Sequence, residues 1–524
     1  MSRVCVAAGC GVCERSGAGG LLGLPRTRGN RTVAFETVGE ETMRRLPAFP
    51  RSSFTRSLTP GIARPAAAIG RTAIAIAAVV IPVGTATAQF GGGAGGGAGV
   101  VIDPQGVLRL ETTQDDGGRL AAERRKAAVA SLPGELKAKS PLRKVALGRL
   151  ERELAGAVKS GHGVPEAMRM LAGLTRVRYV FIYPEDGDRP GEVVIAGPAE
   201  GWATDGFGRT TGIETGSPTV LLEDLATAIR AFPPGQPTDR LIGCSIDPTE
   251  QGLAAMQRFV KDTGRVNPGI GPDEIVAGLR DSLGPQVVSV QGVSPATHFA
   301  QVLVEADYRM KLIAIGLEPP PVKMTSFIDL AAASSVAANA LKRWYFVPEL
   351  KCVRPSGDDL AIELVGRGVK LCGADEVVLA GGKRMGADRP DKASESFTQA
   401  FTKKYPDIAA RSPVFAQLRN LIDLSVAAAY LQEQDAYGCT GWEAATLRDE
   451  AAYPIETLPA PKQVDPAINA VWRGARLLTP IGGGVVIHPR LSLDPPNLLA
   501  DEGAAVEKAR VTAANLPANR WWWD

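Results

Sequence analysis

The sequence lacks any uninterrupted apolar run of the roughly 18 to 20 residues that a membrane-spanning helix needs, which argues against a protein that crosses a membrane several times. Its 524 residues include 59 basic and 56 acidic side chains, so the formal net charge is only +3. Hydrophobic residues make up 45% and charged residues 22%, which argues against a coiled coil and a mostly disordered chain. The length allows two or three domains with sizeable hydrophobic cores.

Histidine is scarce, and the motifs of familiar catalytic and metal sites are missing. The three histidines, His162, His298 and His488, lie far apart, and none belongs to an H-E-x-x-H pair. There is no G-x-S-x-G elbow, and Gly381–Arg384 lacks the Ser/Thr and the upstream glycine of a phosphate-binding loop. We therefore predict neither a metal site nor a cofactor.

A targeting signal is the clearest local feature. Six arginines and no acidic residue lie between Met43 and Arg71, followed by an apolar run of 12 residues and by the tripeptide Ala-Thr-Ala that ends at Ala88. A basic segment, a short apolar core and an A-x-A site describe a secretory signal peptide. We predict a presequence over residues 1–88, with the true start at Met43 and cleavage between Ala88 and Gln89. A retained N-terminal anchor is the alternative.

Export also changes the charge balance. Without residues 1–88 the chain carries 52 acidic and 48 basic residues, so its net charge does not indicate a nucleic-acid partner. We predict an exported protein of the periplasm, the cell envelope or the medium, with no membrane span in the mature chain. The choice between the general and the twin-arginine export route stays open, because a bare arginine pair is a weak signal.

The remaining chain predicts an α+β fold made of two packed lobes. Residues 89–117 begin with a glycine-rich run and are predicted to be a flexible tether. Helical and strand patterns alternate over 118–320, and residues 321–500 are strand-rich and then helical, with Pro319–Pro321 as the boundary. Residues 501–524 form a C-terminal tail that ends in Trp521–Trp523 and Asp524. This tail either docks on the protein, stays disordered or binds a partner.

The periodicity of apolar residues locates the individual elements. Helices are predicted at 142–158, 165–173, 219–232, 248–260, 272–283, 394–403 and 412–435, and from Ser294–Pro295 to Gly316. Strands are predicted at 177–183, 192–197, 239–246, 286–290 and 482–488, and in three runs between 343 and 380.

His298, Glu305 and Arg309 are the best acid–base candidates. All three fall on one flank of the helix predicted from Ser294, where the glutamate can orient the histidine and the arginine can hold an anionic substrate. Salt bridges along the helix edge explain the same residues without catalysis, because Glu305 stands four residues before Arg309, the favourable order for an ion pair. Both interpretations stay open.

Four cysteines remain after residues 1–88, and an even number in an exported protein permits two disulfides. Cys352 and Cys372 lie on adjoining predicted strands, so we predict that they form one pair. Cys244 and Cys439 then follow by elimination. Four small thiols buried without a bond are the alternative.

Several long blocks of sequence occur together in one order. They are 177–202, 215–232, 242–259, 298–318, 342–353 and 412–431, and they include VRYVFIYPEDGD, LLEDLATAIRAF and HFAQVLVEADYRMKLIAIGLE. Together these blocks resemble a family of exported planctomycete proteins known only as a domain of unknown function, number fifteen-ninety-eight. The resemblance implies export and supplies no activity, so no catalytic residue follows from it.

These observations favour a non-catalytic protein of the cell envelope or periplasm that binds a partner protein or an envelope polymer. Export, the tether, the missing motifs and the tryptophan tail support this interpretation. The alternative is an uncharacterised hydrolase-type enzyme that uses His298, Glu305 and Arg309. A cleft that holds these three side chains within hydrogen-bonding distance would favour the enzyme.

Overall fold

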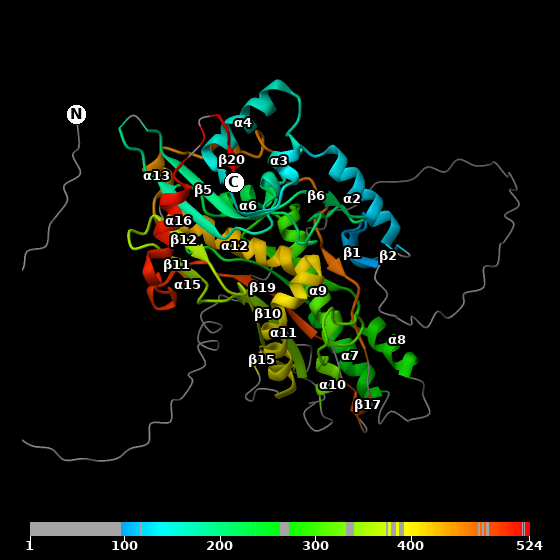
Figure 1. The fold of residues 1–524 in the computed structure, drawn as a ribbon. Helices are drawn as coiled ribbons and strands as arrows, with labels where there is room; N and C mark the ends of the chain where they lie inside the picture. The colour runs from blue at the N-terminus through cyan, green and yellow to red at the C-terminus, as the bar shows by residue number, and fades with distance from the viewer. Residues whose placement is uncertain are drawn as a thin grey trace, which may run out of the picture. The chain divides into compact units, whose positions relative to one another are not determined.

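The computed structural model describes residues 96–524 except 116–117, 188, 236, 263–271, 332–339, 374–375, 379–383, 387–391, 470–471, 474–475, 478–480, 516 and 518. Over these residues the fold is α+β, as predicted, with helices packed against two larger sheets (Figure 1). The predicted presequence 1–88, its start at Met43 and the cleavage site lie outside the described residues.

The larger sheet has ten strands in the order β1-β2-β16-β9-β8-β19-β10-β14-β15, with β13 also paired to β10. Its neighbours are antiparallel except for β10 with β19 and β16 with β2. The strands are β1 (Gly96–Ile102), β2 (Val107–Gln114), β8 (Ile242–Asp247), β9 (Gln286–Gln291), β10 (Ala340–Pro348), β13 (Val369–Gly373), β14 (Glu376–Val378), β15 (Arg384–Gly386), β16 (Gln463–Val464) and β19 (Ile481–Ile487).

A second, antiparallel sheet has six strands in the order β11-β12-β4-β5-β3-β20. They are β3 (Ser140–Ala146), β4 (Tyr179–Tyr183), β5 (Glu192–Ala199), β11 (Val353–Pro355), β12 (Ala361–Leu364) and β20 (Trp522–Trp523). Two short hairpins join β6 (Trp202–Thr204) to β7 (Thr210–Gly212) and β17 (Trp472–Arg473) to β18 (Arg476–Leu477).

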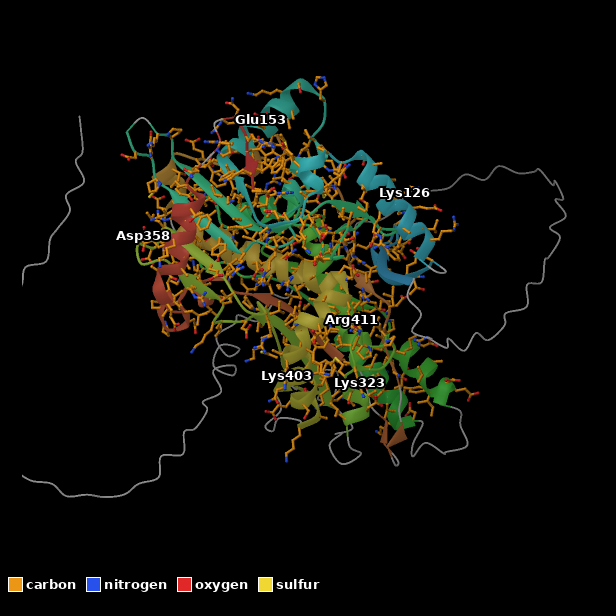
Figure 2. The ribbon with its side chains drawn as sticks, in the orientation of Figure 1. Lys126, Glu153, Lys323, Asp358, Lys403 and Arg411 are labelled. Atoms are coloured by element: carbon orange, nitrogen blue, oxygen red, sulfur yellow. The ribbon has the colours of Figure 1, made fainter. Side chains whose placement is uncertain are left out.

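The helices are α2 (Arg119–Ser131), α3 (Gly134–Lys137), α4 (Leu147–Ser160), α5 (Glu166–Arg169), α6 (Leu222–Ala231), α7 (Glu250–Asp262), α8 (Pro272–Leu283), α9 (His298–Ala314), α10 (Phe327–Leu330), α11 (Lys392–Arg411), α12 (Pro413–Glu433), α13 (Ala436–Thr440), α14 (Ala445–Arg448), α15 (Arg490–Leu493) and α16 (Ala505–Ala513). Charged side chains such as Glu153 on α4 and Lys403 on α11 are exposed and point outward (Figure 2).

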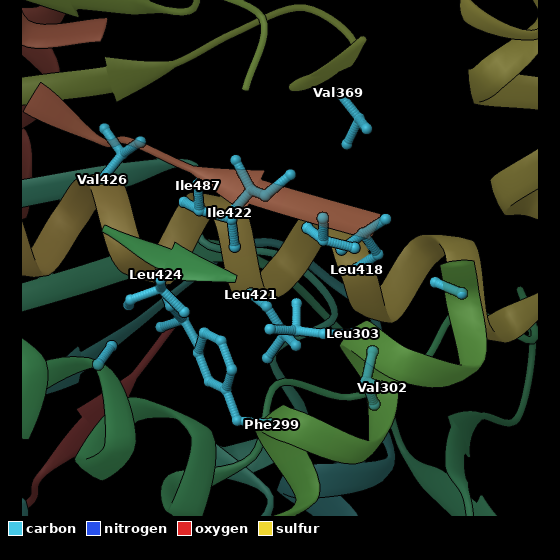
Figure 3. Packing of buried hydrophobic residues seen from close by; sticks show 14 of the residues in the cluster. Phe299, Val302, Leu303, Val369, Leu418, Leu421, Ile422, Leu424, Val426 and Ile487 are labelled. Carbon is cyan, nitrogen blue, oxygen red and sulfur yellow. The ribbon is translucent and has the colours of Figure 1, made fainter. Parts of the chain in front are cut away.

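Helix α12 is the centre of the hydrophobic core. Nearly all its residues from Val414 to Gln432 are buried, and a helix that is apolar on every side belongs inside a protein. In Figure 1 it runs between β5 and β12 of the smaller sheet and β19 of the larger one. Its Leu421 and Ile422 belong to one buried cluster with Leu303 of α9 and Ile487 of β19 (Figure 3). Helix α9 packs in turn on β8 and β19.

The predicted tether is wrong from Gly96 onward. Residues 96–102 form β1, which pairs along its whole length with β2 in an antiparallel hairpin. At Gly99 an added Cβ would lie 2.5 Å from the Phe207 ring, so only a glycine allows the ring to pack this closely against β1. A glycine-rich composition does not distinguish a flexible linker from a strand that another segment approaches closely.

The predicted helix 142–158 is wrong in its first five residues. Ser140–Ala146 form β3, and α4 begins only at Leu147. Strand β3 pairs with β5 on one side and with β20 on the other, so its backbone groups are satisfied by segments far away in the sequence. Leu142 and Val145 fit a helical stripe and a buried strand equally well, and the tertiary pairing decides between them.

The proline run Pro319–Pro321 does not separate the two sheets. Strands β8 and β9 precede it and β10 and β19 follow it, yet all four belong to the larger sheet. Strands β4 and β5 likewise share the smaller sheet with β11 and β12. The predicted segments 118–320 and 321–500 are therefore interleaved through both sheets.

The C-terminal tail docks on the protein itself, which was one of the predicted outcomes. Trp522 and Trp523 form β20 against β3, and Trp523 is buried. The fully buried Arg143 lies 4.8 Å from the centre of the Trp522 ring, and its Nε donates to Asp524 Oδ1 at 2.8 Å. A cation–π contact and a charge-assisted hydrogen bond thus hold the tail in place.

Replacing Gly483 with alanine is expected to lower the free energy of unfolding by about 3 kcal/mol or more. Gly483 in β19 has a φ of +132°, and an added Cβ would lie 1.8 Å from the Trp344 carbonyl oxygen. The control is Gly156→Ala in α4, where nothing lies within 4 Å, and it should raise stability by about 0.5–1 kcal/mol. Denaturant unfolding measures both, and equal stabilities would contradict the close approach of β19 to β10.

Candidate functional site

A pocket of about 400 Å³ lies where the starts of α6 and α9 meet the hairpin between β6 and β7. Small-ligand pockets in proteins commonly measure about 300–1,000 Å³, so this one accommodates a small molecule. Several polar side chains line it: Arg169, Arg209, Glu223, His298, Gln417 and Tyr453.

Two helix starts bring the central residues together. Helix α6 places Glu223 and Asp224 in its first turn, where carboxylates interact favourably with the helix dipole. Helix α9 begins at His298, and its N-cap residue Thr297 accepts a hydrogen bond from the backbone of Ala300 at 3.2 Å. Because both helices are anchored by buried faces, the side chains at their starts are held in fixed positions.

His298 is bonded through both of its ring nitrogens. Its Nδ1 lies 3.0 Å from each carboxylate oxygen of Asp224, and its Nε2 lies 3.3 Å from the side-chain amide of Gln417. Burial by itself lowers the pKa of His298, but the negative charges of Asp224 and Glu223 outweigh it and raise that pKa to about 9. His298 is therefore an imidazolium at neutral pH.

The orientation of Gln417 follows from that charge. Placed with its amide nitrogen toward His298, Gln417 leaves its Oε1 buried without a partner. An imidazolium needs an acceptor at Nε2, and amide oxygen and nitrogen are assigned from the hydrogen-bond network. Turning the amide over gives the Nε2 proton an acceptor, so we assign Gln417 Oε1 to this position.

Glu305 and Arg309, which the sequence grouped with His298, have other partners. Glu305 pairs with Arg209, a residue that lines the pocket. Arg309 lies 3.6 Å from Glu305 and donates to Glu318 at 2.6 Å. The predicted salt bridge between Glu305 and Arg309 is confirmed, whereas Asp224 takes the place predicted for Glu305 beside His298. Arg309 is paired with two carboxylates, so its charge is not available to hold an anionic substrate, as the sequence had suggested.

Sequence reasoning missed Glu223, Arg169 and Tyr453. Within the described part of the chain, the Glu223 carboxylate, the Arg169 guanidinium and the Tyr453 hydroxyl have no hydrogen-bond or ion-pair partner. Burial raises the pKa of Glu223, and the neighbouring Asp224 adds to the rise while His298 opposes it. The two adjacent acids Glu223 and Asp224, near the start of the helix predicted at 219–232, were visible in the sequence. No local pattern, however, indicated that they lie near His298.

The four cysteines are free, so neither predicted disulfide is formed. Cys352 precedes β11 of the smaller sheet, whereas Cys372 lies in β13 of the larger one, because β11 and β13 pair with different strands. Cys244 is buried in β8, and Cys439 is exposed in α13. Adjacency of two strands in the sequence did not mean adjacency in space.

Two features are absent from the described residues. No group of three or more His, Cys, Asp or Glu side chains in this part of the chain is arranged to hold a metal ion. None of the helices described here is long and apolar enough to cross a membrane.

Comparison with known proteins gives one match. Residues 244–327, which run from β8 through α9 to α10, match a family described as "Protein of unknown function (DUF1598)". Neither a curated protein nor a solved structure matches the chain. The matched segment includes His298, Glu305 and Arg309 but not the α6 residues that His298 contacts.

The charge of His298 predicts a pH-dependent stability. In the unfolded chain its pKa returns to about 6.5, so the stabilisation is complete below that pH and is lost as the pH rises through about 9. The full effect is about 3 kcal/mol at most. With three histidines in the chain, NMR titration can follow His298 directly.

The Asp224→Asn variant should lower the pKa of His298 and weaken this pH dependence, because Asp224 contributes more to the raised pKa than Glu223 does. The control is Asp239→Asn, since the exposed Asp239 lies 2.9 Å from His488 and does not contact His298. A wild-type His298 that titrates at or below its ordinary pKa would contradict the assigned charge.

Proposed function

We propose that this protein is an exported, non-catalytic binding protein whose pocket at α6 and α9 takes a small polar ligand. The observation that carries the proposal is a pair of opposite charges, Glu223 and Arg169, that line one pocket. Neither side chain makes a hydrogen bond or a salt bridge among the described residues, although the charges of Arg169 and His298 act on Glu223 from a longer distance. The half-buried Glu223 loses contacts with water, and a ligand that supplies a matching donor restores them.

The free groups indicate the chemistry of the ligand. Arg169 is exposed at the pocket and suits a carboxylate or phosphate, which its guanidinium can bind through two hydrogen bonds. The half-buried Glu223 carboxylate suits a hydroxyl or ammonium donor, and the Tyr453 hydroxyl can complement either. A small molecule with one acidic group and a hydroxyl or amino group, such as an amino acid or a sugar acid, meets these requirements.

The state of His298 supports binding rather than proton transfer. Its imidazolium is held by Asp224 and Gln417, so it is not available to take a proton from a substrate. The residues that line the pocket include no serine or cysteine nucleophile. His298 acts in this proposal as a fixed positive charge that keeps the pocket wall in place.

An acid–base hydrolase is the second candidate, and one observation favours it. The Glu223 carboxyl has a raised pKa beside an imidazolium, and carboxyls of this kind serve as proton donors in catalytic sites. This enzyme would use Glu223, not the predicted set of His298, Glu305 and Arg309. Turnover of a bound ligand that Glu223→Gln abolishes while binding persists would establish it.

Ligand binding should raise the melting temperature of the purified protein. Amino acids, sugar acids and hydroxy acids form the panel, and at about 100 times its Kd a ligand adds about 2.7 kcal/mol to stability, a shift of several degrees. Glu223→Gln and Arg169→Gln should each weaken binding about tenfold or more, because each removes one charged contact.

Two exposed residues outside the pocket provide matched controls. Glu153→Gln and Lys403→Gln make the same charge changes on α4 and α11, and both should bind the ligand as the wild type does (Figure 2). A panel without any response, or a response that neither pocket variant weakens, would overturn the proposed binding function. The earlier expectation of a protein partner or an envelope polymer would then be tested by cross-linking.

Export predicts a processed N-terminus. The arginine-rich segment from Met43, the apolar run and the A-x-A tripeptide support cleavage after Ala88. Expression of the full chain in a bacterial host should yield an extracytoplasmic protein that begins at Gln89, as mass spectrometry of its N-terminal peptide would show. Replacing Ala88 with a bulky residue such as phenylalanine should block processing. A wild-type chain that keeps its presequence in the cytoplasm would refute export.

A further inference from the structure

Several polar groups that line the pocket at α6 and α9 are already bonded to other parts of the protein. The Thr204 and Thr210 hydroxyls lie 3.4 Å apart, and the Thr219 hydroxyl donates to the carbonyl oxygen of Thr210 at 3.2 Å. Arg209 is paired with Glu305. These side chains form a polar wall that needs no ligand to complete its hydrogen bonds.

Three polar groups of the pocket remain for a ligand. The Arg169 guanidinium, the Glu223 carboxylate and the Tyr453 hydroxyl make no hydrogen bond or salt bridge among the described residues. Burial raises the pKa of Tyr453, the charge of Glu223 adds to the rise and the charge of Arg169 opposes it. Because the two charges act on the same hydroxyl inside a pocket of about 400 Å³, one small molecule can reach all three groups.

The charges around the pocket balance before a ligand enters. The imidazolium of His298 and the guanidinium of Arg209 each have a carboxylate partner, which leaves one cation, Arg169, and one anion, Glu223. An acid whose only charged group is a carboxylate adds an uncompensated negative charge. A zwitterion keeps the balance, since its carboxylate can face Arg169 while its ammonium faces Glu223.

Four further residues of the lining are apolar. They are Val164, Met170, Leu221 and Pro454. Val164 and Leu221 are half-buried and pack against hydrophobic clusters of the core, so their positions are fixed. Such a wall favours contact with an apolar group, and its side chains offer no hydrogen-bonding partner to the several hydroxyls of a sugar. The part of the ligand that faces this wall is therefore apolar.

We propose that the pocket binds a free α-amino acid with an apolar side chain. Arg169 binds its carboxylate, Glu223 binds its ammonium group, and the side chain lies against Val164 and Leu221. The Tyr453 hydroxyl can donate to the carboxylate or accept from the ammonium. This inference rests on the proposed binding function and narrows its ligand from acids with a hydroxyl or amino group to zwitterions of this one class.

Calorimetric titration of the full chain with L-leucine and L-valine tests the ligand class. At least one of them should bind about tenfold or more tightly than L-serine, which keeps both charges but buries no apolar side chain. It should also bind more tightly than glucuronate, a sugar acid. A sugar acid or hydroxy acid that binds more tightly than both amino acids would overturn this inference and leave the proposed binding function standing.

Two analogues and two variants assign the charged groups. For leucine, 4-methylpentanoate lacks the ammonium group and 3-methylbutylamine lacks the carboxylate; for valine, 3-methylbutanoate and 2-methylpropylamine do the same. The wild type should bind each analogue about tenfold or more weakly than the amino acid. Glu223→Gln should remove the preference over the acid, and Arg169→Gln the preference over the amine. A variant that keeps the full wild-type preference would refute the assignment.

A last substitution tests the apolar wall. Val164→Thr keeps the shape of the side chain and adds a hydroxyl, so it should weaken binding of the apolar amino acid about threefold or more and leave the affinity for glycine unchanged. Val511→Thr on α16 is the control, since Val511 is 66% exposed and lies outside the pocket lining. Unchanged affinity in Val164→Thr, or an equal loss for glycine, would contradict this placement of the side chain.

Discussion

Helix α12 is buried along almost its whole length, and this burial constrains everything around it. A polar side chain inside a core must find a partner, because leaving it unpaired costs about 1–3 kcal/mol. On one face of α12, Gln417 meets His298, and on the other Asp423 accepts a hydrogen bond from Arg176. The same helix therefore fixes one wall of the pocket and, on its other side, the ion pair between Asp423 and Arg176, which precedes β4.

Helix α9 obeys the same constraint with charged residues. Asp307 and Lys311 are both buried and pair at 2.7 Å, and burial raises the pKa of Asp307 to about 6 although Lys311 opposes the rise. Buried pairs of this kind contribute little net stability, but removing one partner leaves a costly isolated charge. Glu305 and Arg309 belong to this structural set. Glu305 and Arg309 stand four residues apart on one side of α9, which suggested a catalytic site. Ion pairing along a helix requires the same spacing, so the pattern does not distinguish the two.

Elements defined by a local sequence pattern were predicted well, whereas elements that depend on pairing with distant segments were missed. Helix α9 and strands β4, β5 and β8 repeat their apolar pattern over their own length, and they were predicted with small errors at their ends. The cap of α9 is Thr297 rather than Ser294, a shift of one turn. Strands β1 and β3 were missed, because β1 lies in a glycine-rich segment and β3 pairs with β5 and β20. Local patterns carry no information on such partners.

The sequence by itself determined the α+β class, the longer helices, several central strands, the scarcity of histidine and the pattern of an export signal. All of these depend on composition or on neighbouring residues. Only the tertiary structure decided which charged groups meet. It brought Asp224 to His298 across 74 positions of sequence and Arg176 to Asp423 across 247. It also left Glu223 and Arg169 facing one pocket. Hydrophobic periodicity states which face of a helix is buried, whereas a hydrogen bond depends on the distance between two helices, and that distance is set by packing of the whole core.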